Sequence, residues 1–168
     1  MPYLNETSSF DSIATPTARR AFTGGSPESK ELLPAGTKLY KWTQHALAGP
    51  RGITPWWSLV NSLQLQTGTV APALRDTQTW AERIGKNDRD YARVRSAVTQ
   101  QWNRMDKPLF AELVQPVWAW VGKASGQLED ENEPKVYLIG GNYQVWAPNL
   151  TIQHIKQIAA LPYLRPRA

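Results

Sequence analysis

Apolar residues recur at helical spacing in the middle of the chain. In the clearest stretch, from Asp88 to Met105, residues three or four positions apart are apolar and the arginines fall largely between them. The apolar positions are Tyr91, Val94, Val98, Trp102 and Met105. Because residues at this spacing share one face of an α-helix, the stretch predicts a helix with a buried face. A weaker pattern from Pro72 to Ile84 predicts a shorter helix before it.

A second apolar run begins at Pro108 and ends before Gly122. Its apolar members are Leu109, Phe110, Leu113, Val114, Val117, Trp118, Trp120 and Val121. We interpret the run as helical. Pro116 is expected to kink or split this helix, because proline lacks the amide hydrogen that an interior helical residue donates.

Segments with strand character lie on both sides of this region. Thr37 to Thr43 follows a Pro-Ala-Gly turn and favours a strand. Trp56 to Val60 is either a short strand or the first turn of a helix, since periodicity does not separate the two. Lys135 to Ile139 predicts a strand, Gly140-Gly141-Asn142 a hairpin turn, and Tyr143 to Ala147 the returning strand.

The last apolar pattern predicts a helix near the end of the chain. Asn149-Leu150-Thr151 supplies capping residues for it. The apolar positions that follow are Ile152, Ile155, Ile158 and Leu161. A strand, several helices, a hairpin and a final helix together predict an α+β fold, with a small, mainly antiparallel sheet and a helical middle segment.

Residues 1–33 are rich in Ser, Thr, Gly and Pro and show no sustained periodicity. We therefore expect a flexible N-terminal lead-in followed by a single domain over residues 34–168. The first residues lack the basic and apolar regions of a secretory signal, and no apolar run approaches the roughly 18 residues that span a bilayer. We expect no membrane insertion, a cytoplasmic location in the producer, and a leaderless route for any secretion into target cells.

The composition excludes several kinds of chemistry. Cysteine is absent, so disulfides, thiolate metal ligands and cysteine nucleophiles are excluded. The histidines, His45 and His154, are far apart and lack partners at metal-binding spacing, so no metal is predicted. Neither a Walker sequence nor a dinucleotide fingerprint is present. The net charge of +5 comes from scattered residues, which fits a solvated basic surface as well as a nucleic-acid or acidic partner.

Tryptophan is unusually frequent, with 8 residues. Large aromatic rings dominate protein cores, and they also form the stacking faces that planar ligands need. The adjacent pair Trp56-Trp57 is therefore open to both interpretations. Gln144 is similarly ambiguous, because a polar residue after a turn is an ordinary sheet-face residue unless other residues join it.

Three stretches resemble the ADP-ribosyltransferase fold of bacterial toxins, and in particular NAD glycohydrolase toxins of the tuberculosis necrotizing toxin type. They are LPAGTKLYKW (33–42), GITPWWSLV (52–60) and GGNYQVWAPNL (140–150). The resemblance implies an NAD-consuming toxin or effector domain, either an NAD glycohydrolase (a hydrolase) or an ADP-ribosyltransferase, with NAD as its substrate. It further implies an immunity protein as a partner, and a protein or nucleic-acid acceptor where the ADP-ribose is transferred.

The resemblance also implies site residues. Gln144 occupies the catalytic position, where the family has Glu or, in the necrotizing toxin group, Gln. Lys41 stands where the family has the Arg or His that holds NAD. The positions implied to bind NAD are Tyr40, Lys41, Thr54, Trp56, Trp57 and Ser58. A catalytically degenerate protein of the same fold, which holds a protein or nucleic acid, is the alternative.

Overall fold

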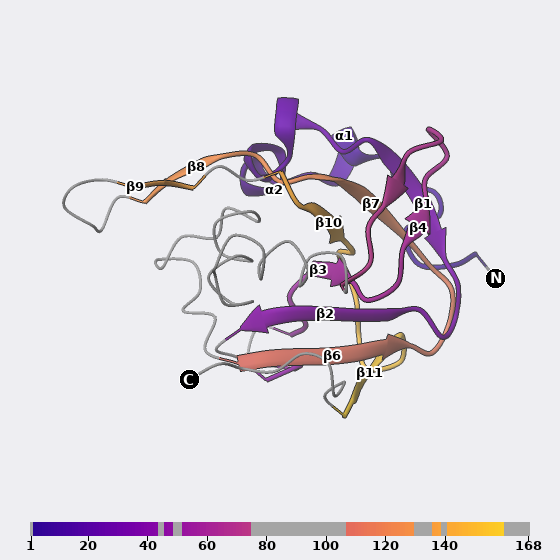
Figure 1. Cartoon of the computed structure of the whole chain (residues 1–168). Helices are drawn as coiled ribbons and strands as arrows, with labels where there is room; N and C mark the ends of the chain where they lie inside the picture. The colour runs from indigo at the N-terminus through magenta and orange to yellow at the C-terminus, as the bar shows by residue number, and fades with distance from the viewer. Residues whose placement is uncertain are drawn as a thin grey trace.

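Seven strands, paired antiparallel throughout, form the main sheet of this protein (Figure 1). The computed structural model describes residues 2–43, 46–48, 52–74, 107–129, 136–138 and 141–159. In spatial order the strands are β1 (Ser29–Leu33), β7 (Val117–Lys123), β10 (Tyr143–Trp146), β3 (Trp56–Leu59), β2 (Lys38–Thr43), β6 (Lys107–Leu113) and β11 (Ile155–Ile158). The mainly antiparallel α+β fold expected from the sequence is therefore confirmed.

Four further strands pair outside the main sheet. β4 (Leu63–Gln64) pairs with β5 (Val70–Ala71), and β8 (Gln127–Glu129) pairs with β9 (Val136–Leu138). In Figure 1 the β8–β9 ribbon extends away from the main sheet. Among the described residues, no helix is long and apolar enough to cross a membrane.

Two short helices and a 3-10 turn precede the sheet. They are α1 (Phe10–Ile13), α2 (Pro16–Ala21) and η1 (Thr23–Gly25). Ser9 caps α1 by accepting a hydrogen bond from the Ser12 amide, and Thr15 caps α2 by accepting one from the Ala18 amide. Helices this short are not stable in isolation, so their packing against the sheet holds them in place.

The sheet buries residues on both faces. On the face that we call inner, Leu39, Trp57 and Val145 belong to the largest cluster of buried residues. The opposite, outer face carries two smaller clusters. The first cluster contains Phe10, Ala18, Phe22, Trp120 and Trp146, with Trp56 packed against it. The far cluster contains Tyr40, Trp42, Val60, Leu74 and Phe110.

The N-terminal residues, expected as a flexible lead-in ahead of a domain starting at 34, lie against this sheet. β1 pairs with β7 along its whole length. Phe10 and Phe22 are buried, with their ring centroids 5.8 Å apart in an edge-to-face arrangement. Twelve positions separate these two rings in sequence, so no periodic pattern reveals that they pack together. The packed unit therefore begins well before residue 34.

One expected strand is confirmed here, and one ambiguity is resolved. β2 matches the strand expected over 37–43, and within the stretch from Trp56 to Val60, Trp56–Leu59 forms strand β3 instead of a helical turn. The helix expected over 88–105, and the part of the 72–84 helix beyond Leu74, lie outside the described residues.

The helical interpretation of the run from Pro108 to Val121 is wrong. The run forms two strands, β6 and β7, which lie in different parts of the sheet and are separated by Val114 to Pro116. Most of their residues are buried whichever face they point to. A strand covered on both faces reads as a continuous apolar run, and periodicity does not distinguish this from a buried helix.

The expected final helix is also wrong. Ile155–Ile158 is strand β11, at the edge of the sheet beside β6. The preceding residues form a turn in which the His154 amide donates to the Thr151 carbonyl at 2.9 Å. Ile152, expected on the apolar helical face, is 74% exposed. Asn149 adopts a positive φ of 69°, which begins a turn and not a helical cap.

Both strands of the expected terminal hairpin exist, but they do not pair with each other. β9 pairs with β8, whereas β10 lies between β7 and β3. The Gly141 amide donates to the Ala124 carbonyl at 2.9 Å, so the glycine turn joins the end of β7. The Gly-Gly-Asn signal predicts a turn from local conformation alone, and it does not specify which strand is next to it.

Gly122 allows the N-terminal segment to approach the sheet, and this yields a stability prediction. A Cβ at this position would lie 2.9 Å from Phe22 Cδ1 and 3.0 Å from both the Glu28 amide nitrogen and Pro27 Cα. Gly122→Ala should therefore destabilise the protein by about 1 to 3 kcal/mol, because backbone atoms must move. Urea unfolding measures this, and Lys123→Ala, at the exposed next position, should change stability by less than about 0.5 kcal/mol. Equal effects of the two substitutions would contradict the close packing at Gly122.

Candidate functional site

The three sequence stretches that resemble the toxin family come together in the structure. Although residues 43–139 separate the first from the last, they contribute β2, β3 and β10, which are neighbours in the sheet. Figure 1 shows β10, β3 and β2 one below the other. The candidate site is therefore built on adjacent strands, where side chains are held more rigidly than on loops.

A row of residues crosses these strands on the outer face. Tyr40 on β2 lies opposite Ser58 on β3. Trp57 lies opposite Val145 on β10, so Gln144, the residue before Val145, lies on the same face of the sheet as Ser58, the residue after Trp57. Directly opposed residues share a face of the sheet, and their Cβ atoms are about 4.5 to 5.5 Å apart. Tyr40, Ser58 and Gln144 thus form one cross-strand row, which we call the outer row.

Gln144 is half-buried, and its amide is fixed. Its Nε2 donates a hydrogen bond to the carbonyl oxygen of Ala21, at the end of α2, at 2.8 Å. A carbonyl oxygen only accepts hydrogen bonds, so the amide nitrogen must face Ala21 and the amide oxygen must face elsewhere. The contact therefore determines which polar atom of Gln144 is left for a ligand.

Aromatic rings surround the outer row. Trp56 is half-buried and packs between Trp146, at 6.1 Å between centroids, and Phe22, at 5.5 Å. Tyr40 stacks on Phe110 at 6.0 Å with an interplanar angle of 28°. Both rings are therefore part of packed clusters, and of the two only the half-buried Trp56 keeps exposed surface for a planar ligand.

The other three predicted residues form a separate group on the inner face. The Lys41 ammonium lies 3.9 Å from the ring centroid of Trp57 and donates to the carbonyl and the hydroxyl of Thr54. Trp57 is only 1% exposed, and its indole Nε1 has no hydrogen-bond partner among the residues that the structure describes. We call Lys41, Thr54 and Trp57 the inner group.

Lys41 is half-buried, and this changes its acidity. Burial lowers the pKa of Lys41 from its ordinary value of 10.5 to about 7, because removal of water disfavours the ammonium form. The face of an aromatic ring attracts a cation and opposes this change in part. With a pKa of about 7, both the charged and the neutral form of Lys41 are populated near neutral pH.

The structure thus divides the seven implied site residues between two faces. Tyr40, Trp56, Ser58 and Gln144 lie on the outer face, and the inner group lies on the other. The physical reason is that successive residues of a strand point to opposite sides. Neighbours in sequence, such as Tyr40 and Lys41 or Trp56 and Trp57, therefore do not line the same side of the sheet.

The sequence did not indicate two features, one beside the outer row and one on the inner face of β10. The first is the Ala21 carbonyl, which carries no side-chain signal. The second is Tyr143, whose hydroxyl donates to both carboxylate oxygens of Glu28, at 2.9 and 3.1 Å. Burial and this carboxylate raise the pKa of Tyr143 to about 12. Within the described ranges, no three His, Asp or Glu side chains gather in a way that would hold a metal ion.

The lowered pKa of Lys41 predicts a pH-dependent stability. Between about pH 7 and the unfolded pKa of 10.5, the unfolded chain binds more protons than the folded chain, so stability rises with pH in this window. Lys41→Met cannot titrate and should lose this part of the slope. Urea unfolding at several pH values measures the difference. Thr54→Val keeps the titrating lysine and should keep the slope; parallel curves for Lys41→Met and the wild type would contradict the shift.

Comparison with known proteins gives matches in structure only. No protein-family model matches the chain, and no curated protein sequence matches it significantly. A chain from the structure of Tne2 in complex with Tni2 is similar over 83% of this chain and 93% of that chain, with a TM-score of 0.49 and 14% identity. A chain from the structure of Tse6 in complex with Tsi6 is similar over 89% of this chain and 88% of that chain, with a TM-score of 0.42 and 10% identity.

Proposed function

We propose that this protein is a toxin-like effector domain that consumes NAD by cleaving the bond between nicotinamide and ribose. The observation that carries the proposal is the placement of three motif segments on adjacent strands. The segments that resemble the NAD glycohydrolase toxins supply β2, β3 and β10, and one residue of each lies in the outer row. This placement supports the proposal because it brings residues of all three segments to one face of the sheet.

The outer row has the chemistry that this reaction needs. Cleavage of the nicotinamide–ribose bond passes through a cationic, oxocarbenium-like state, so catalysis depends on holding the ribose and on stabilising positive charge. The Gln144 amide oxygen, turned away from Ala21, accepts hydrogen bonds from ribose hydroxyls and directs the negative end of its dipole at the cation. The Ser58 hydroxyl beside it provides a second contact to the ribose.

The amide also favours one outcome of the reaction. An amide offers a dipole and not a full negative charge, and it is a poor base for activating a protein side chain as acceptor. We therefore favour water as the acceptor, which makes the protein an NAD glycohydrolase instead of a transferase. An immunity protein that blocks this activity is the partner implied by the resemblance.

Lys41 has no direct role in this proposal. Its ammonium is held on the inner face by Thr54 and Trp57, whereas the outer row lies on the opposite side of the sheet. The nicotinamide ring is assigned to the half-buried Trp56, on the same face of the sheet as Gln144. The inner group instead links two segments of the chain, since Lys41 of β2 donates to Thr54 in the loop that precedes β3.

Release of nicotinamide from NAD by the purified protein tests the proposal. We expect Gln144→Ala to lower the rate by at least about a hundredfold, since it removes the group that faces the developing charge. Gln157→Ala, on the exposed side of β11, is the matched control and should leave the rate unchanged. Absence of nicotinamide release by the wild type would contradict the proposal, and full activity of Gln144→Ala would remove Gln144 from the site.

The alternative is a degenerate protein that binds a partner without catalysis. The observation in its favour is that Gln144 and Lys41 both bond to groups within the chain, namely Ala21 and Thr54. If NAD is not cleaved, the affinity for single-stranded nucleic acid, measured at increasing salt, distinguishes a nucleic-acid partner from a protein partner. A steep loss of affinity with salt indicates contacts to phosphates, and salt-independent or absent binding leaves a protein partner.

A further inference from the structure

Residues 6–25, which we call the N-terminal strap, cross the outer face beside Gln144. Lys30 on β1 anchors the start of the strap by donating to the carbonyls of Glu6 and Ser8, at 2.8 and 2.6 Å. The Thr23 hydroxyl anchors its end by donating to the Ala124 carbonyl at 3.1 Å. The strap is therefore tied to the sheet on both sides of its helices.

Two phenylalanines hold the middle of the strap against the tryptophans of the sheet. Phe10 packs edge-on against Trp146 with 5.5 Å between centroids and an interplanar angle of 81°. Phe22 packs against Trp56 at 5.5 Å. Both phenylalanines are buried, so each removes a large apolar surface from water. This packing fixes the height of α2 above the sheet.

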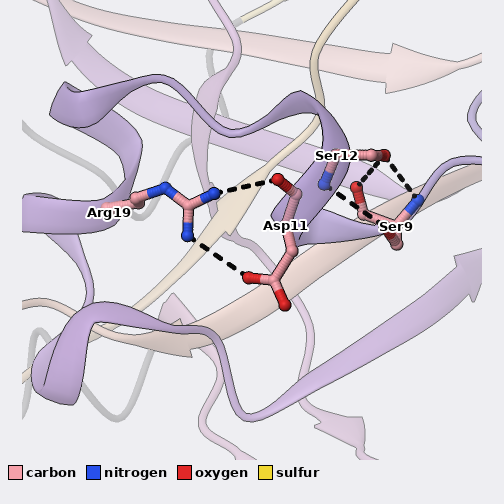
Figure 2. A network of polar contacts seen from close by, with 4 residues as sticks. All are labelled: Ser9, Asp11, Ser12 and Arg19. Atoms are coloured by element: carbon pink, nitrogen blue, oxygen red, sulfur yellow. Dashed lines mark hydrogen bonds and ion pairs between the residues drawn. The ribbon is translucent and has the colours of Figure 1, made fainter.

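The strap is also stiffened from within. Figure 2 shows Arg19 of α2 reaching Asp11 of α1, where it donates to the carbonyl at 2.9 Å and to the carboxylate at 3.2 Å. The same view shows Ser9 and Ser12 closing a capping box at the start of α1. The ion pair is exposed and adds little stability by itself, but together these contacts define how the two helices are joined.

At the end of α2, one carbonyl oxygen joins the strap to two strands. The Ala21 carbonyl accepts from the Ser125 amide and from Gln144 Nε2, each at 2.8 Å. Ser125 follows β7, and Gln144 lies on β10 opposite Gly122 of β7. Because a carbonyl oxygen has two acceptor sites, both bonds can be satisfied at once. The orientation of the Gln144 amide therefore depends on where the strap places Ala21.

We infer that the strap positions Gln144: the Ala21 carbonyl binds the amide nitrogen and thereby presents the amide oxygen to the ribose of the substrate. This inference rests on the proposed function for its role in catalysis, but the contact itself is testable without a substrate. Ala21 is a positioning residue, since it acts through Gln144. The outer row and the strap together then make up the site.

The inference makes glutamate an unfavourable replacement at this position. A carboxylate has no hydrogen to donate, so Gln144→Glu places a negative oxygen against the Ala21 carbonyl oxygen, and the two repel. Gln144→Met removes the donor without adding charge. We expect the Ala21 contacts to weaken slightly in the Met variant and strongly in the Glu variant, although Glu is the residue that many proteins of the resembling family carry here.

The experiment follows hydrogen exchange in the full, isotope-labelled chain by NMR. The Nε2 protons of Gln144, assigned by their loss in Gln144→Ala, should exchange slowly in the wild type. Phe22→Leu keeps an apolar residue but removes the ring that seats the strap, and it should speed their exchange by about tenfold or more. Ile13→Ala, which loses packing in the same cluster but is on α1 and not on α2, is the matched control and should leave these protons slow.

A second readout covers the case in which Phe22→Leu does not fold. Exchange of the Ser125 backbone amide, which shares the Ala21 carbonyl, should be slowest in the wild type, faster in Gln144→Met and fastest in Gln144→Glu. Equal exchange in the Met and Glu variants would overturn the inference. Unchanged exchange of the Gln144 protons in a folded Phe22→Leu variant would overturn it as well.

Activity on NAD separates the inference from the proposed function. If NAD is cleaved, Phe22→Leu should lower kcat by about tenfold to a hundredfold with little change in KM, because a misplaced group costs rate more than binding. An unchanged kcat for NAD cleavage in Phe22→Leu would overturn the positioning role but would not contradict the proposed function. A wild type that leaves NAD intact but shows the exchange effects would support the positioning contact and exclude the proposed function.

Discussion

The pairing of β10 with both β7 and β3 is the contact on which the rest of the structure depends. Only four residues form β10, yet they join β1 and β7 on one side to β3, β2, β6 and β11 on the other. Val145 lies fully buried on the inner face against Trp57 and Val121, whereas Gln144 and Trp146 lie on the outer face. The same four residues therefore complete the core and supply the candidate catalytic group.

The outer face shows how stability and site geometry share one set of contacts. The helices of the strap are four and six residues long, so the burial of Phe10 and Phe22 on the tryptophans holds them in place. Once α2 is seated there, its last carbonyl meets the amide of Gln144. A half-buried amide without a partner would cost free energy, and the same bond that avoids this cost orients the side chain.

The division of the implied residues between two faces changes how the motifs are interpreted. The resemblance points to three stretches that form adjacent strands, β2, β3 and β10. It did not identify which side of each strand faces a common site. Strand alternation places Lys41 and Trp57 together on the inner face, where the ammonium has partners of its own. Strand register, and not membership of a motif, therefore decides which residues act together.

By itself, the sequence determined the α+β class, the strands near Trp42 and Trp146, and the absence of any thiol chemistry. These follow from composition and from patterns within a few residues. Only the tertiary structure decided that the run after Pro108 forms two strands, that β9 pairs with β8, and that the N-terminal strap bonds to Gln144 through Ala21. The reason is that these features depend on burial from both faces of the sheet and on pairing between distant segments. The strongest helical pattern, over 88–105, lies outside the described residues and stays a prediction.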